Sequence, residues 1–112
     1  MYSRHMRGDL LRGHLDGLLL VVLADSPGHG YELSRRLTDR SGGELDVHEG
    51  SLYPALHRLE RGGLVTSAWS RGAGRRRRVY RLTAAGRRAA GESRREWRTF
   101  STAVDRVLGG TA

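Results

Sequence analysis

Five arginines lie close together in one short segment of the chain and could bind a polyanion. Four of them are consecutive and the fifth precedes them by four positions: Arg75, Arg76, Arg77 and Arg78, with Arg71 before them. In the free protein these cations repel one another, and the phosphates of a nucleic acid would relieve that repulsion. Each phosphate neutralised contributes about −0.9 to the slope of log affinity against log salt. The segment therefore predicts salt-dependent nucleic-acid binding, although charge runs are often simply solvated.

A second set of candidate residues lies on a segment with a helical pattern, Glu49–Arg61. Leu52, Leu56 and Leu59 recur at i, i+4 and i+7 and predict a buried stripe. The outward face then carries Ser51, Tyr53, Pro54, His57, Arg58 and Arg61. Such polar groups can bind base edges and phosphates in a DNA major groove, which accepts an α-helix. An ordinary solvated helix face is the alternative interpretation.

Three helices are expected ahead of the arginine segment. They run from near residue 9 to the Ser-Pro-Gly at 26–28, over residues 29–40, and within 49–61. Pro54 must lie early in the third helix, where a missing N–H costs least. The sequence leaves open whether Ser51 or a residue before Glu49 caps this helix.

The apolar period then changes to the alternation of short strands. Residues 64–70 and 78–82 predict a β-hairpin, with residues 71–77 as a flexible basic tip. Thr83 is a good N-cap for a long last helix. Small and apolar residues of that helix recur at steps of four and three, which is typical of a helix packed along another helix: Gly86, Ala90, Ser93, Trp97, Phe100, Val104 and Val107.

This order of elements predicts a mainly α fold with a small β-hairpin (α+β). It corresponds to a winged helix-turn-helix followed by a long C-terminal dimerisation helix. We expect a flexible basic arm at 1–8, a DNA-binding domain at 9–82 and the dimerisation helix at 83–109. The residues expected at the dimer interface are Leu11, Leu15, Ala90, Trp97, Phe100, Val104 and Val107.

Composition limits the classes of function further. The chain of 112 residues carries 20 Arg and no Lys against 12 Asp plus Glu, a formal charge of +8 that suits a nucleic acid. The absence of cysteine excludes thiol catalysis and Cys-based metal sites. The longest apolar run, 18–24, is too short to span a bilayer and no signal pattern precedes it, so we expect a cytoplasmic protein.

Groups that could support catalysis are not arranged for it. No nucleophile–base pair, paired carboxylates or phosphate-cradling glycine loop stands out, so we expect no enzyme and no cofactor. His48 with Glu49, and His57 with Glu60, lack a convincing ligand spacing, so we expect no metal site.

Four motifs resemble the PadR family of bacterial transcriptional regulators. They are HGYEL at 29–33, GSLYPALHRLE at 50–60, GLV at 63–65 and YRLTAAG at 80–86, and the similarity runs from about Leu10 to the end. The resemblance implies a winged-helix homodimer, formed largely through the last helix, that represses at a pseudo-palindromic operator. The single last helix is similar to the smaller PadR subgroup. The family places the third helix in the major groove, which implies groove-facing Ser51, Tyr53, Pro54 and His57, with Arg75–Arg78 in the wing.

The resemblance also implies a small aromatic or hydrophobic effector. In some small members a Trp of the last helix lines a ligand site at the dimer interface, and Trp97, with Phe100 beside it, corresponds to that position. The alternative is that both are simply interface residues.

Two other functions stay open at this stage. The last helix could bind a foreign protein partner, as in a non-regulatory adaptor, if the chain were monomeric with an exposed apolar stripe. RNA binding is less favoured because the sequence lacks the exposed aromatic strand platform of single-strand readers.

Overall fold

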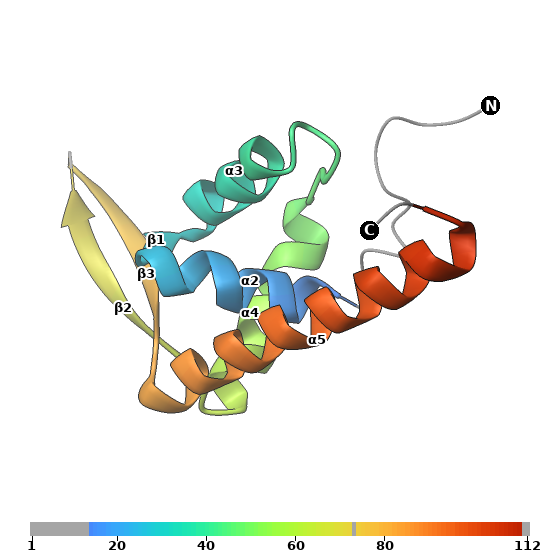
Figure 1. Cartoon of the computed structure of the whole chain (residues 1–112). Helices are drawn as coiled ribbons and strands as arrows, with labels where there is room; N and C mark the ends of the chain where they lie inside the picture. The colour runs from blue at the N-terminus through green and yellow to red at the C-terminus, as the bar shows by residue number, and fades with distance from the viewer. Residues whose placement is uncertain (1–13, 73, 111–112) are drawn as a thin grey trace.

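Four helices and three strands make up the part of the chain that the structure, a computed structural model, describes: residues 14–72 and 74–110. Their bounds are α2 (Leu15–Asp25), β1 (Gly28–His29), α3 (Gly30–Arg40), α4 (Glu49–Arg61), β2 (Val65–Gly72), β3 (Arg75–Leu82) and α5 (Ala84–Leu108) (Figure 1). This is the expected α+β order. The expectations about the basic arm at 1–8 and about Leu11 lie outside the described residues.

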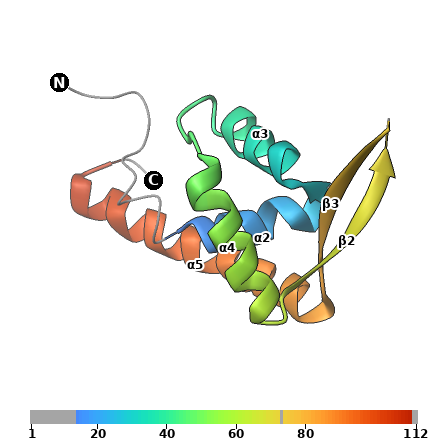
Figure 2. The same cartoon turned by 180° about the vertical axis from the view of Figure 1, so that it is seen from behind.

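The helix α2 lies at the centre of the fold and is apolar on most of its surface. It packs against α3, α4 and α5, and Figures 1 and 2 show it between these helices from both sides. Its buried side chains are Leu15, Leu19, Leu20, Val22 and Leu23. A helix that is buried on several sides needs such a composition, and the leucines of α3 and α4 complete the same core. No helix within the described residues has the length and apolar character that crossing a membrane requires.

The second expected helix is present as α3, and its first turn is closed by a capping box. His29 is the N-cap: its ring accepts a hydrogen bond from the Glu32 backbone N–H, and the Glu32 carboxylate accepts one from the His29 N–H. This reciprocal pair satisfies two of the backbone donors that a helix start leaves free. Arg36 of α3 also holds the segment that follows α2: its guanidinium donates to the carbonyls of Ser26 and Pro27, at 2.8 and 3.0 Å.

The sheet differs from the expected hairpin in two ways. It has a third strand, β1, in the antiparallel order β1–β3–β2. The strands of the hairpin are also longer than expected, because Arg71 pairs with Arg76 and Gly72 with Arg75. The prediction of a flexible tip over 71–77 is therefore wrong. The short turn that remains includes Gly74 with φ at 76°, a conformation that glycine adopts without strain.

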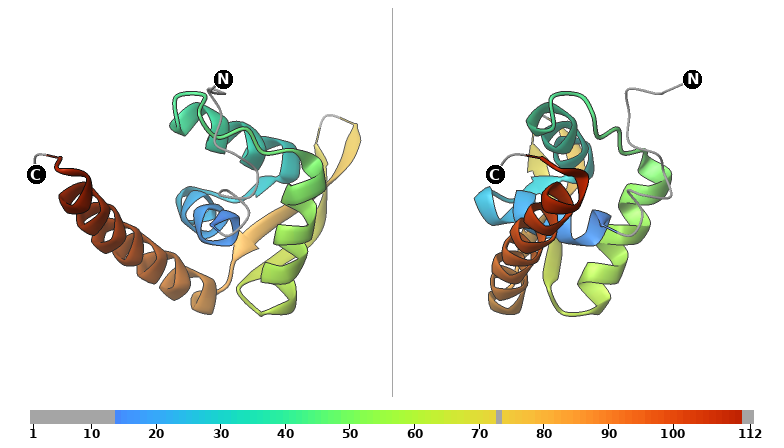
Figure 3. Two further views of the ribbon diagram at one scale, coloured as in Figure 1. Left: turned by 90° about the vertical axis from the view of Figure 1, so that its right-hand side faces the viewer. Right: turned by 45° about the vertical axis from the view of Figure 1, so that its right-hand side comes forward.

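The last helix, α5, begins and ends as predicted. The Thr83 hydroxyl accepts from the Gly86 N–H at 3.0 Å, and Gly109 closes the helix in the left-handed region, with φ at 79°. Its first half packs on the body of the fold, and a Cβ on Gly86 would clash with the Leu64 carbonyl. Its far end runs away from the body (Figure 3).

Candidate nucleic-acid interface

The outward face of α4 is exposed as the apolar spacing predicts. Leu52, Ala55, Leu56 and Leu59 are buried, and the helix begins after His48, which settles the position of the N-cap. The His48 side chain makes no capping hydrogen bond. The exposed side chains are Ser51, Tyr53, Pro54, His57, Arg58 and Arg61. All six are the residues expected on this face.

Tyr53 has one side against the protein and one side free. Its phenol lies against the backbone of Gly30 at the start of α3, so closely that a Cβ on Gly30 would overlap it. The side chain is nevertheless 43% exposed. This packing limits the positions of the ring, so Tyr53 is presented to a partner with little freedom to move.

Arg58 differs from the other exposed groups of α4 because it is already paired. It donates from Nε and Nη2 to the two carboxylate oxygens of Asp16 on α2, at 3.2 and 2.8 Å. This hydrogen bonding, with the charge of Asp16, raises the pKa of Arg58. The bidentate pair ties α4 to α2, and it competes with the expected use of Arg58 toward DNA.

The strand alternation divides the wing arginines into two pairs. The side chains of Arg76 and Arg78 leave the backbone on the hairpin face that carries Trp69, whereas those of Arg75 and Arg77 leave it on the other face. Arg78 is half-buried: its Nε donates to Ser67 Oγ at 2.8 Å, and Ser67 Oγ donates to Glu60 of α4 at 2.7 Å. Arg78 is therefore anchored to α4, while the other arginines of the hairpin are exposed.

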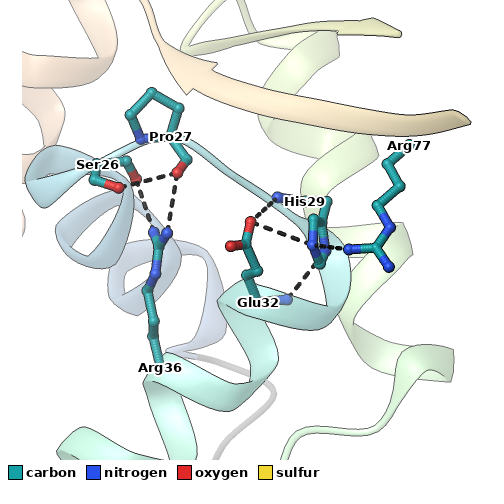
Figure 4. A network of polar contacts seen from close by, with 6 residues as sticks. All are labelled: Ser26, Pro27, His29, Glu32, Arg36 and Arg77. Atoms are coloured by element: carbon teal, nitrogen blue, oxygen red, sulfur yellow. Dashed lines mark hydrogen bonds and ion pairs between the residues drawn. The ribbon is translucent and has the colours of Figure 1, made fainter. Parts of the chain in front are cut away.

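Arg77 meets the start of α3 in a small polar network (Figure 4). Its Nη1 lies 2.7 Å from Nε2 of His29, whose Nδ1 accepts from the Glu32 N–H at 3.3 Å. A neutral imidazole has one acceptor nitrogen, so the ring can accept from the helix or from Arg77 but not from both at once. The contact joins the capped helix start to the wing.

A groove lies between the start of α3, the start of α4 and the hairpin. Its volume is about 760 Å³, and its lining includes Tyr31, Tyr53, Trp69 and the arginines 75–78. A second hollow of about 910 Å³ continues along α4 past Pro54, His57 and Arg61. Tyr53, Arg78 and Tyr80 line both. Most of the predicted residues of α4 and of the hairpin thus share one basic and aromatic surface, while exposed Ser51, Arg58 and Arg71 lie outside its lining.

The residues expected at the dimer interface fall into two groups. Leu15 and Ala90 are 1% and 2% exposed and belong to the core of the chain itself, because α5 packs here on its own α2. Trp97 and Val104 are half-buried, and Phe100 and Val107 are exposed. Among the predicted interface residues that the structure describes, only this second group leaves apolar surface for a partner.

Trp97 and Phe100 also line a hollow of about 330 Å³ beside the start of α2. The Trp97 ring is edge-on to His14, with centroids 4.7 Å apart, and to Phe100, with centroids 5.9 Å apart. The remaining lining comes from Gly17, Ser93 and Glu96. The site is thus mainly aromatic, with a carboxylate at its edge.

Sequence reasoning missed three residues that shape the interface: His29, Glu60 and Trp69. The HGYEL motif contains a capping-box spacing from His29 to Glu32, but histidine is an unusual cap. Trp69 lies four residues after the buried Val65 in β2, so the period-two pattern could have placed both on one face, which is also the face of Arg78. Glu60 gave no signal, because its partners are distant in space until the hairpin folds against α4.

Helices packed around α2, with α4 exposed beside an arginine-bearing hairpin, define a winged-helix DNA-binding protein. A sequence model of the transcriptional regulator PadR-like family matches residues 19–92. The chain therefore belongs to the PadR-like family of transcriptional regulators, as its motifs indicated. It is a DNA-binding regulator of transcription, and the expectation that it is not an enzyme is confirmed by this membership.

Individual relatives agree with the family assignment. The transcriptional regulator Rv3488 of Mycobacterium tuberculosis is 46% identical over 92 residues, which is 82% of this chain and 80% of the relative. A PadR-like transcriptional regulator from Bacillus cereus has a solved structure with a TM-score of 0.79 and 30% identity, covering 93% of this chain and 100% of that one. The structure of a transcriptional regulator from Clostridium thermocellum has a TM-score of 0.78 and 27% identity, covering 88% of this chain and 97% of that one. The winged-helix fold is confirmed by these structures.

Proposed function

We propose that this regulator is a repressor that binds a pseudo-palindromic operator as a homodimer. The observation that carries the proposal is the common surface formed by the exposed face of α4 and the arginine-bearing hairpin. One α4 would enter the major groove at each half-site, with Tyr53, Pro54 and His57 toward the base edges. The groups on this face are the kinds that hydrogen-bond or pack on bases.

The hairpin would contribute affinity with little sequence preference. Arg75, Arg76 and Arg77 are exposed along its strands, where they can reach the phosphates beside the groove that α4 occupies. Such contacts position a protein on the duplex and make its affinity depend on salt. Arg78, which is anchored to Glu60 through Ser67, would mainly hold the hairpin in place.

The far half of α5 is the proposed dimer interface. Phe100 and Val107 are 56% and 85% exposed, and Trp97 and Val104 continue the same stripe. A second copy of this helix would cover the stripe by the heptad packing that its spacing predicts. Figure 3 shows this half of α5 on the side away from α4 and the hairpin, which leaves the DNA-facing surface free.

A small aromatic or hydrophobic effector could act through the hollow beside Trp97 and Phe100. This hollow adjoins the proposed interface, so a bound ligand would favour one angle between the two copies of α5. Two recognition helices must lie about 34 Å apart to read neighbouring half-sites, and a changed angle would disturb that spacing. The ligand can shift the equilibrium only by its differential affinity for the two states.

Selection of bound fragments from the host genome, with sedimentation analysis of the protein alone, tests the proposal. We expect a dimer and a pseudo-palindromic consensus whose half-sites are about 10 base pairs apart. Tyr53→Ala should weaken binding to that consensus more than binding to random DNA. The charge-changing control Arg88→Ala, exposed on α5, should not alter the preference for the consensus. A monomer that selects no consensus would favour the adaptor function, and a preference for RNA over the same duplex would also contradict the proposal.

A further inference from the structure

Trp69 is a large aromatic residue in the hairpin whose position the core does not explain. It lies in the middle of β2 and is 57% exposed. The guanidinium carbons of Arg76 and Arg78 lie over its ring, 4.7 and 5.3 Å from the centroid. Among the described residues, these are the two arginines placed over the indole. An exposed tryptophan covered by two cations points to a role in holding those cations.

The strand register explains how the stack forms. Arg78 is the direct cross-strand partner of Trp69, and Arg76 is the diagonal neighbour on the same face. Both positions are within reach of a large aromatic side chain in an antiparallel pair. Tryptophan is also the side chain whose ring attracts cations most strongly. The stack is thus built into the pairing of β2 with β3.

The stack is connected to α4 through hydrogen bonds. Arg78 donates from Nε to Ser67 Oγ at 2.8 Å, and Ser67 donates to Glu60 at 2.7 Å. Arg78 Nη2 also lies 3.9 Å from the Glu60 carboxylate. Glu60 belongs to the last turn of α4, so the chain of interactions runs from α4 through Arg78 to Trp69 and then to Arg76.

We propose that Trp69 is a positioning residue for DNA binding, which holds the Arg76 guanidinium at a fixed place relative to α4. A free arginine loses several rotatable torsions when it binds a phosphate, and a guanidinium already held on an indole loses fewer. Trp69 would therefore increase affinity through Arg76 without itself touching DNA. This inference rests on the proposed binding of the hairpin to the phosphates.

A double-mutant cycle on a random-sequence duplex of about 30 base pairs tests the inference. Trp69→Ala should weaken binding about three- to tenfold, the range expected when a rotamer-rich side chain must be immobilised on binding and is no longer held in advance. It should leave the slope of log affinity against log salt unchanged, because every arginine remains. Arg76→Ala should weaken binding and make that slope shallower by about 0.9. In the Arg76→Ala background, the further change Trp69→Ala should have little effect.

Two substitutions separate the effect of the aromatic ring from that of side-chain size, and a second double-mutant cycle, with Arg75 in place of Arg76, serves as the matched control. Trp69→Phe should retain most of the affinity because it keeps an aromatic face, whereas Trp69→Leu should behave like Trp69→Ala. Arg75 starts on the opposite face of the hairpin, so Trp69→Ala and Arg75→Ala should be additive. Circular dichroism of each variant confirms that the exposed substitutions leave the fold intact.

The possible failures of this experiment are distinguishable. If Arg76→Ala weakens binding but is additive with Trp69→Ala, then Trp69 acts independently, for example by stacking on a base, and the inference alone is overturned. If Trp69→Ala or Trp69→Leu leaves affinity unchanged, the inference is also overturned. If Arg76→Ala changes neither affinity nor salt slope, the proposed role of the hairpin fails, and the inference fails with it.

Discussion

At the scale of single residues, three histidines of the described chain, His14, His29 and His48, occupy helix N-cap positions, but only His29 acts as a cap. The His29 ring accepts from the Glu32 N–H, whereas His48 makes no such bond at the start of α4. We expect His29→Ala to lower the free energy of unfolding by about 1 kcal/mol and His29→Asn to lower it by less, because Asn is a favourable cap. Urea unfolding measures both changes. His48→Ala is the matched control and should have a smaller effect, and equal losses at the two positions would contradict the assignment.

Tyr80 provides a prediction about pH. Its side chain is buried in the sheet, and this burial raises the pKa of its phenol above the ordinary value of about 10. The unfolded chain therefore loses the Tyr80 proton at lower pH than the folded chain does. Stability should fall as pH rises through the unfolded pKa toward the raised folded one.

The variant Tyr80→Phe isolates this contribution from that of the other tyrosines. Unfolding free energies measured near pH 7 and near pH 11 should fall less with pH in Tyr80→Phe than in the natural chain. Parallel losses in the two proteins would show that Tyr80 does not titrate differently on folding. The comparison uses the difference between the two proteins in how their free energy of unfolding changes with pH, so the contributions of titrating groups present in both cancel.

At the scale of elements, the hairpin should separate into two pairs of arginines with different effects. Replacing Arg75 and Arg77 by Ala should remove phosphate binding together with the exposed contact of Arg77 to His29, so the salt slope should become shallower by about 0.9 for each phosphate that is no longer neutralised. Replacing Arg76 and Arg78 should lower affinity and also the free energy of unfolding, because Arg78 bonds Ser67 beside Glu60. Salt-dependent DNA binding and urea unfolding distinguish the two double variants.

Replacing all four residues 75–78 by Ala provides the limiting case of the same experiment. It should flatten the salt dependence most strongly, since it removes both pairs. An unchanged slope in the quadruple variant would remove the hairpin from the DNA-binding surface. Equal stability losses in the two double variants would instead show that strand alternation does not divide their roles.

The helices were easier to predict from the sequence than the sheet was. Leu52, Leu56 and Leu59 define the buried side of α4 through local spacing alone, and so fix which residues are exposed. The two-residue strand β1 has no period to detect and exists because Gly28 pairs with Tyr80, a distant partner. Residues 71–77 lack the alternation of a strand and therefore predict a flexible tip, whereas cross-strand pairing places Arg71, Gly72 and the arginines 75–77 in strands.

At the scale of the whole molecule, one stripe along α5 serves two different surfaces. Gly86, Ala90 and Ser93 pack into the chain's own fold, where a Cβ on Gly17 of α2 would meet Ser93. Phe100 and Val107 continue the spacing but are exposed. Sequence periodicity predicts that a helix has a packing partner, but it cannot distinguish a partner in the same chain from one in another copy. Ala90 is an example: its spacing fits a dimer interface, but it packs within its own chain.

The exposed half of that stripe gives the prediction that concerns assembly. Phe100→Glu should leave the single chain folded, because Phe100 is 56% exposed in it. In the proposed dimer the same change would bury an unpaired charge, so we expect dimerisation to weaken by about a hundredfold or more. Sedimentation velocity over a range of protein concentrations measures the dissociation constant. Operator affinity should fall in parallel, because one α4 alone reads only a half-site.

The control for this change is Thr102→Glu, which adds the same charge on the side of α5 away from the stripe. Its side chain is exposed, and the heptad places it opposite Phe100, so it should sediment like the natural chain. If Phe100→Glu and Thr102→Glu dimerise equally well, the interface lies elsewhere on the molecule. In that case the spacing of the two copies of α4 would be set by a different surface, and the hollow beside Trp97 would no longer adjoin the dimer interface through which an effector is proposed to act.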